Sequence, residues 1–148
     1  MIELMGEAGG IGLAATQVGL AWRLFVAHVP PGDDRSAEDD PASATEHPLV
    51  CINPVLSEPS AELETHEEGC LSLPDINGDV IRPARITISA TDLTGRAFSL
   101  RAQGLLARCW QHELDHLEGV LIIDRMTQIS RMKNRAAVRD LERTAQHA

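Results

Sequence analysis

Two histidines four residues apart, inside a helical pattern, are the feature that most constrains this chain. Apolar residues recur at steps of three and four over 105–117, and Gly119 follows, which predicts a helix beginning near residue 104. His112 and His116 then project from one helix face, with Cβ atoms about 5–6 Å apart. Two imidazoles at that spacing can bind one metal ion, with Glu113 beside them as a candidate general base. The alternative is a helix with two solvated histidines, and the apolar residues on the same face favour the metal site.

A catalytic metal site needs a third protein ligand and keeps one position for water. Cys70 is favoured by its context, Glu-Gly-Cys-Leu-Ser-Leu-Pro, in which Gly69 lets the backbone approach another group closely. The alternative for Cys70 is a small buried apolar residue. Besides the carboxylates, the other histidine and cysteine candidates stay open: His28, His47, His66, His147, Cys51 and Cys109.

The segment Gly10–Gln17 combines two glycines and two alanines with a single amide side chain. Small residues let its backbone run close to a ligand, and the Gln17 amide is a suitable donor to a developing oxyanion. The alternative is a glycine-rich turn that caps a helix. The segment is not a phosphate loop, because no Lys-Ser or Lys-Thr pair follows it.

The remaining pattern predicts an α+β fold. Alternating or short apolar runs predict antiparallel strands at 20–29, 49–54, 80–81, 85–91 and 97–102. Residues 1–8 are expected to be the tail of a helix and residues 130–146 a C-terminal helix. We therefore expect antiparallel β-sheets packed around a central metal-binding helix. A chain of 148 residues suits a single domain over 1–148.

Charge and composition narrow the possible partners. Residues 1–100 hold 16 acidic and 5 basic side chains, which argues against a DNA-binding surface. The Asp- and Pro-rich segment 31–48 is expected to be a mobile acidic loop. Three cysteines do not make a disulfide framework, and no apolar run approaches the length of a membrane span. A cytoplasmic location is the expectation, with an organelle as the alternative, and we expect no membrane contact.

Three motifs, in this order along the chain, resemble those of the peptide deformylase family. They are Gly10–Gln17, Glu68–Ser72 and Gln111–His116. The resemblance covers nearly the whole chain outside the acidic segment. It implies one divalent metal ion, Fe(II) in the cell, with Zn(II), Ni(II) or Co(II) as substitutes. The metal ligands implied by the motifs are Cys70, His112 and His116.

The resemblance also implies roles around the metal. Glu113 would be the catalytic acid and base, and Gln17 with the backbone N–H of Leu71 would form the oxyanion hole. Gly12 would bind the substrate backbone. For the methionine side chain we expect an apolar pocket; the alternative for its candidate residues is ordinary core packing. These candidates are Ile11, Leu106 and Cys109.

The implied function is removal of the N-formyl group from the N-terminal methionine of nascent polypeptides. The implied partners are the formylated nascent peptide and, transiently, the ribosome, with the protein a monomer or homodimer. A metallopeptidase shares the two-histidine helix and is one alternative. The other alternative is a non-catalytic, metal-binding module associated with the ribosome.

Three features depart from the family pattern. Members usually carry a strand and a helix before the first motif, whereas nine residues precede Gly10 here, so we expect that N-terminal segment to be missing. Thr16 stands where proline is common. The stretch Asp75–Asp79 replaces one that often carries an arginine near the substrate, so contacts to the peptide beyond its methionine are expected to differ.

Overall fold

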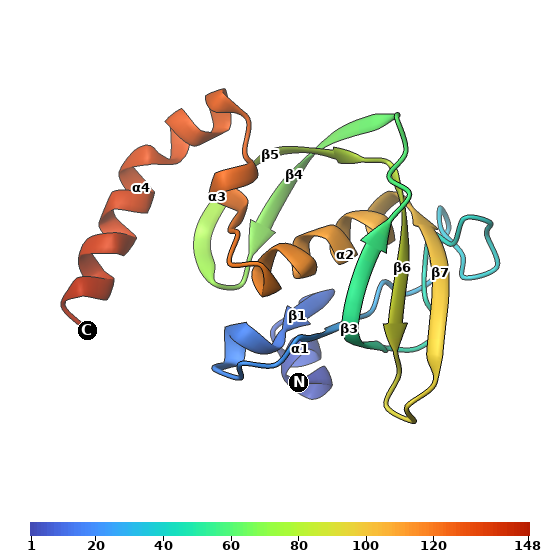
Figure 1. Ribbon diagram of the computed structural model, residues 1–148. Helices are drawn as coiled ribbons and strands as arrows, with labels where there is room; N and C mark the ends of the chain where they lie inside the picture. The colour runs from blue at the N-terminus through green and yellow to red at the C-terminus, as the bar shows by residue number, and fades with distance from the viewer. The chain divides into compact units, whose positions relative to one another are not determined.

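The computed structural model describes residues 1–148, which divide into two compact units. The first unit comprises residues 1–64 and 82–119, and the second comprises residues 65–81 and 120–148. Both contain strands and helices, and the predicted α+β class with a C-terminal helix is confirmed (Figure 1). None of the helices is both long enough and apolar enough to cross a membrane.

A five-stranded antiparallel sheet forms the framework of the first unit. Its strands lie in the order β1-β2-β3-β6-β7, so β6 pairs directly with β3 although two strands of another sheet lie between them in sequence. In β6 the apolar residues are buried, and Ser89 between Ile88 and Ala90 is exposed, as in a strand with one face on a core. The bounds are β1 Gly12–Ala14, β2 Leu24–Ala27, β3 Leu49–Ser57, β6 Arg85–Thr91 and β7 Ala97–Gln103.

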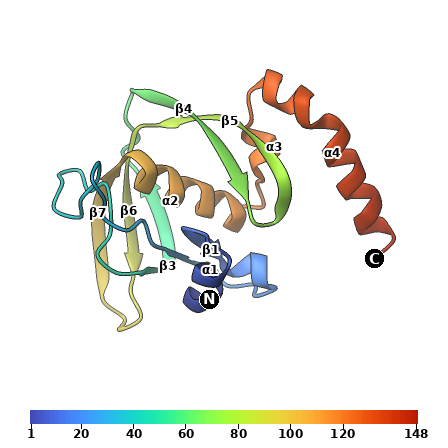
Figure 2. The ribbon, with the colours of Figure 1, turned by 180° about the vertical axis from the view of Figure 1, so that it is seen from behind.

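Helix α2, Gly104–Leu117, packs against β1, β2, β6 and β7 of this sheet. Its apolar face inserts Leu106 and Trp110, both fully buried, into the same core as Phe25 and Ile88. The helix ends at Leu117, two residues before the predicted terminator Gly119, whose φ of +74° suits glycine. Figure 2 shows α2 from behind, with β6 and β7 beside it. Burial of one helix face against the sheet fixes the direction of the face that carries the histidines.

The start of the chain forms helix α1, Ile2–Glu7, as expected. Met5 is buried in a small cluster with Leu13 and Val26, so α1 packs beside β1 and β2. After β1 the chain makes a single 3-10 turn, η1, Ala15–Val18. The glycine-rich motif is therefore a short strand followed by a tight helical turn.

The segment 31–48 follows a defined path over part of its length. Ala42 forms a parallel bridge with Ala102 of β7, and the N–H of Gln103 donates to the Ala42 carbonyl at 2.9 Å. Residues 42–45 are buried. The mobility of the segment stays a prediction, but its second half contributes backbone contacts to the sheet.

The second unit contains a hairpin and two helices. Strands β4, Leu63–Cys70, and β5, Leu73–Pro83, form a two-stranded sheet, although the sequence pattern indicated only residues 80–81 there. Most of β4 is polar and exposed, so it lacks the apolar alternation that reveals a half-buried strand. Helices α3, Ile122–Arg125, and α4, Gln128–Gln146, follow.

Contacts with β5 fix the beginning of α4 in this unit. The N–H of Asp79 donates to the Ser130 hydroxyl at 2.9 Å, and the Asn134 amide donates to the Asn77 carbonyl at 2.8 Å. Ile76 and Met126 lie in the small apolar core of the second unit. The rest of α4 has few buried residues, in keeping with the polar sequence predicted for it.

Candidate metal centre

The two motif histidines face each other on α2. Their Nε2 atoms lie 3.2 Å apart, and their ring centroids are 4.9 Å apart with the planes at 67°. His116 is buried and His112 is half-buried. The helical repeat places residues four apart on one face, and here it brings one ring nitrogen from each imidazole to the same point.

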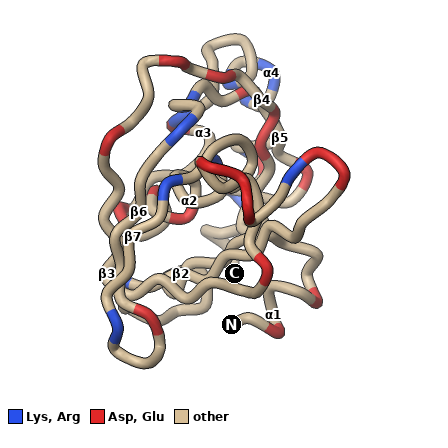
Figure 3. Tube along the Cα trace, turned by 90° about the vertical axis from the view of Figure 1, so that its right-hand side faces the viewer, with Lys and Arg blue, Asp and Glu red and all other residues tan.

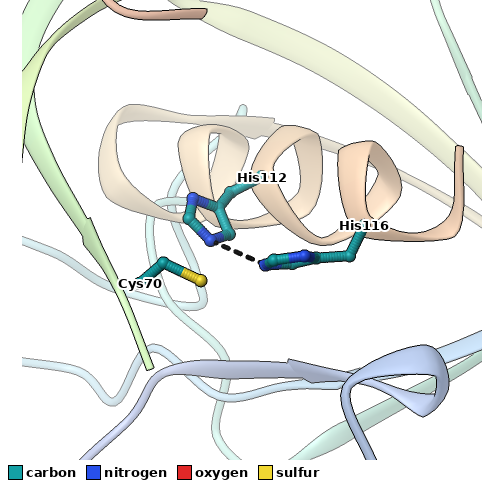
Figure 4. Close-up of side chains that lie close together, drawn as sticks. All are labelled: Cys70, His112 and His116. Carbon is teal, nitrogen blue, oxygen red and sulfur yellow. Dashed lines mark hydrogen bonds between the residues drawn. The ribbon is translucent and has the colours of Figure 1, made fainter. Parts of the chain in front are cut away.

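Cys70, at the end of β4, completes a group of three possible ligands. One ligand atom from each of Cys70, His112 and His116 lies within 4.8 Å of the other two (Figure 4). One thiolate and two imidazoles match the donor set of a three-ligand catalytic site for zinc or a similar divalent metal. The chemistry of the donors therefore fits a metal ion.

The other cysteine candidates have different surroundings. Cys51 is fully buried among apolar side chains, and burial raises the pKa of its thiol to about 12, so it stays protonated at neutral pH. Cys109 is also buried, and its Sγ donates to the Ile11 carbonyl at 3.3 Å. Among the cysteines and histidines considered from sequence, Cys70 is the one that groups with the histidine pair.

Glu113 follows His112 directly and is 4% exposed. The backbone of Gly12 in β1 lies against its side chain, since a Cβ at position 12 would stand 2.7 Å from Cγ and Cδ of Glu113. No side chain fits there without displacing the carboxylate. The glycine-rich motif and the histidine motif, about 100 residues apart in sequence, are thus in direct contact.

Gln17 lies in η1, next to β1 on the same stretch of chain. The N–H of Ala14 donates to its Oε1 at 2.9 Å, which fixes which end of the amide faces the backbone. The Nε2 end, the hydrogen-bond donor, is turned away from Ala14. An amide NH2 is a suitable donor to a developing oxyanion, and this role of Gln17 stays a prediction.

The residues expected to line a methionine pocket lie in or beside the hydrophobic core. Leu106 is fully buried and Cys109 nearly so, and half-buried Ile11 packs against the same cluster. Leu71, whose N–H was expected in the oxyanion hole, has a side chain that is 46% exposed. The roles of these four residues stay predictions.

Arg82 was not singled out from the sequence, and its side chain forms an ion pair with α2, the helix that carries the two histidines. Its Nη1 donates to Oδ2 of Asp115 at 2.9 Å, and the two side chains are 5% and 12% exposed. Gln111, on the same helix, donates to the Pro83 carbonyl at 3.1 Å. The signal in the sequence was an arginine directly after two apolar residues of a strand, where burial demands an anionic partner.

Comparisons with known proteins agree on one family. Residues 1–132 match the family model described as polypeptide deformylase. Among curated relatives, peptide deformylase 2 of Gloeobacter violaceus is 48% identical over 126 residues, covering 85% of this chain and 62% of the relative. The peptide deformylase of Erythrobacter litoralis is 42% identical over 161 residues, covering 100% of this chain and 81% of the relative.

Solved structures give the same result. A Plasmodium falciparum peptide deformylase superimposes with a TM-score of 0.86 at 35% identity, covering 100% of this chain and 81% of the other. Arabidopsis thaliana peptide deformylase 1B superimposes with a TM-score of 0.84 at 39% identity, covering 99% of this chain and 76% of the other. The chain spans 62% and 58% of the length of the first two curated relatives.

Proposed function

The chain belongs to the polypeptide deformylase family, and we propose that it hydrolyses the N-formyl group of the N-terminal methionine of nascent polypeptides. The observation that carries the proposal is the grouping of one cysteine and two histidines next to a buried glutamate. The comparisons favour neither a metallopeptidase nor a non-catalytic metal-binding module.

We assign the metal to Cys70, His112 and His116. When bound, a divalent ion there supplies a Lewis acid and an activated water. Fe(II) is the proposed ion in the cell, with Zn(II), Ni(II) and Co(II) as substitutes. Metal analysis of protein purified without oxygen, for wild type and Cys70→Ala, tests this assignment. We expect about one ion per wild-type chain, and a weakly held ion in the variant.

The proton transfers fall to Glu113. Its carboxylate takes a proton from the attacking water as the new C–O bond forms at the formyl carbon, and it returns that proton to the amine nitrogen as the C–N bond breaks. The products are formate and a free N-terminal methionine. Its position directly after His112, buried and held beside Gly12, supports this role.

Charge that develops on the formyl oxygen would be held by two donors. These are the Gln17 amide and the backbone N–H of Leu71. The orientation of Gln17 by the Ala14 N–H supports the first of them. The formyl carbon carries only hydrogen, so a tight site would reject an acetyl group, and Ile11, Leu106 and Cys109 are proposed to contact the methionine side chain.

The proposed partner is the formylated nascent peptide, met during transient association with the ribosome in the cytoplasm. Helix α4 supports a ribosomal contact by its charge: it holds five basic and two acidic residues in a chain of net charge -9. The basic residues are the blue segments of α4 in Figure 3. The proposed assembly state is a monomer or a homodimer.

The deciding experiment is a deformylation assay. The Ni(II)-loaded protein is mixed with formyl-Met-Ala-Ser, acetyl-Met-Ala-Ser or unmodified Met-Ala-Ser, and formate and free peptide are measured. We expect formate from the formyl peptide and no change in the other two. Glu113→Gln should bind metal, and its kcat should be lower by about 10²–10⁴-fold. Cleavage of unmodified peptide, or full activity of Glu113→Gln, would refute the proposal.

A further inference from the structure

The proposed oxyanion donor Gln17 lies in the short turn η1, whose position depends on contacts with the rest of the fold. The turn η1 has four residues, and at its end the Gly19 N–H donates to the Thr16 carbonyl at 3.3 Å and the Leu20 N–H to the Ala15 carbonyl at 3.0 Å. A 3-10 turn of this length is not stable alone. Its placement against α2 must come from contacts outside the turn.

Two such contacts join this segment to the last turn of α2. The Thr16 hydroxyl donates to the carbonyl of His116 at 3.3 Å, and the N–H of Gly119 donates to the same carbonyl at 3.2 Å. Arg23, at the far end of the same segment, forms an ion pair with Glu118 at 2.7 Å. A weaker contact of 3.4 Å runs from the Arg23 guanidinium to the Pro54 carbonyl of β3.

We propose that Thr16 and Arg23 are positioning residues that hold η1, and with it the Gln17 amide, against the turn of α2 that carries His116. The inference rests on the proposed function for Gln17. Thr16 lies in the turn directly before Gln17 and Arg23 lies five residues after its end, so the two contacts restrain the chain on both sides of Gln17. Both side chains are largely solvent-accessible, so each contact is weak and its loss should change catalysis without unfolding the protein.

The experiment compares Thr16→Val, Arg23→Met and the double variant with wild type, as Ni(II)-loaded protein. We expect kcat for formyl-Met-Ala-Ser to fall about threefold in each single variant and about tenfold in the double variant. KM and Ni(II) affinity should stay within about twofold, since the contacts restrain neither the peptide nor the ligand atoms. Thr16→Ser, and the charge exchange Arg23→Glu with Glu118→Arg, should restore kcat.

A second readout does not depend on activity. Amide hydrogen exchange at Gly19 and Leu20 in the metal-free protein should become about tenfold faster in the double variant. Arg85→Met, which breaks an ion pair of similar exposure with Glu62, is the matched control and should leave both readouts unchanged.

Unchanged kcat and exchange in the double variant would overturn the inference. So would a loss of Ni(II) affinity in place of kcat, or an equal effect of Arg85→Met. If wild type binds metal but shows no turnover, the proposed function fails. The exchange rates then decide on their own whether Thr16 and Arg23 hold the turn.

Discussion

Gly12 and Glu113 are packed so closely that a single methyl group does not fit between them. A Cβ built on Gly12 would stand 2.7 Å from Cδ of the carboxylate. Gly12 is buried in β1, and Glu113 is buried on the face of α2 that β1 covers. The glycine therefore allows the strand to approach the helix, and that approach holds the glutamate side chain in one place.

Gly12→Ala should impair catalysis by moving Glu113. A displacement of about 1 Å in a catalytic group typically costs about a hundredfold in rate, and we expect a fall in kcat of that order with metal content unchanged. Steady-state kinetics and metal analysis measure the two effects. Gly6→Ala in α1 is the control, because a Cβ there meets nothing within 4 Å. Equal activity of both variants would show that Glu113 can shift without consequence.

Substitution of Gln17 tests whether the NH2 end of its amide acts as the oxyanion donor. Gln17→Glu keeps an oxygen for the Ala14 N–H but replaces the donor NH2 with a second acceptor. We expect the kcat of Gln17→Glu to fall by a factor of about 10²–10³, as for loss of an oxyanion donor. The kcat of Gln17→Leu should be no lower. The comparison is made on kcat at saturating formyl peptide. A Gln17→Glu variant with near-wild-type kcat would exclude the amide nitrogen as a donor.

The buried ion pair of Arg82 and Asp115 should matter for stability. Arg82→Met leaves a carboxylate buried without its partner, which typically costs about 3–5 kcal/mol in the free energy of unfolding. Arg82→Met combined with Asp115→Leu should cost less than Arg82→Met alone, since no charge is then left buried. Urea denaturation of the metal-free protein measures these energies. Arg85→Met, in the exposed pair with Glu62, should cost about 0–1 kcal/mol, and a similar value for Arg82→Met would contradict the prediction.

The buried thiol of Cys51 should make the protein less stable at high pH. Its pKa rises from 9.0 to about 12 on burial, so between those values the unfolded chain loses a proton that the folded chain keeps. The contribution of the protonated Cys51 thiol to the free energy of unfolding is therefore complete below pH 9. It declines by about 1.4 kcal/mol per pH unit between pH 9 and the raised pKa.

Cys51→Val isolates this contribution, because valine can fill the buried site and cannot ionise. The free energy of unfolding, measured from pH 8.5 to about 10.5, should fall less steeply in the variant than in wild type. The chain has one lysine and no tyrosine, so few other side chains titrate in this range. Parallel curves for the two proteins would show that the pKa of the Cys51 thiol is the same in the folded and unfolded states, which would contradict the prediction.

Local geometry explains which predictions could be made without the structure. A helical repeat determines where residues four apart point, so the sequence alone predicted α2, its histidine pair and the neighbouring Glu113. Apolar alternation likewise predicted β6 and β7, and the polar C-terminal helix became α4. The hairpin β4–β5 was largely missed because its first strand is polar and exposed.

Contacts between distant segments were decided by the tertiary structure alone. The residue pattern favoured Cys70 as the third metal ligand and the family resemblance implied it, while residue reasoning alone left other cysteines, histidines and carboxylates open; the structure groups Cys70 with His112 and His116. The approach of Gly12 to Glu113 and the pairing of Arg82 with Asp115 also have no local signature. Periodicity fixes which way a side chain points from its own element. Which group it meets depends on strand pairing and on burial of the helix face, and those are settled only when the whole chain packs.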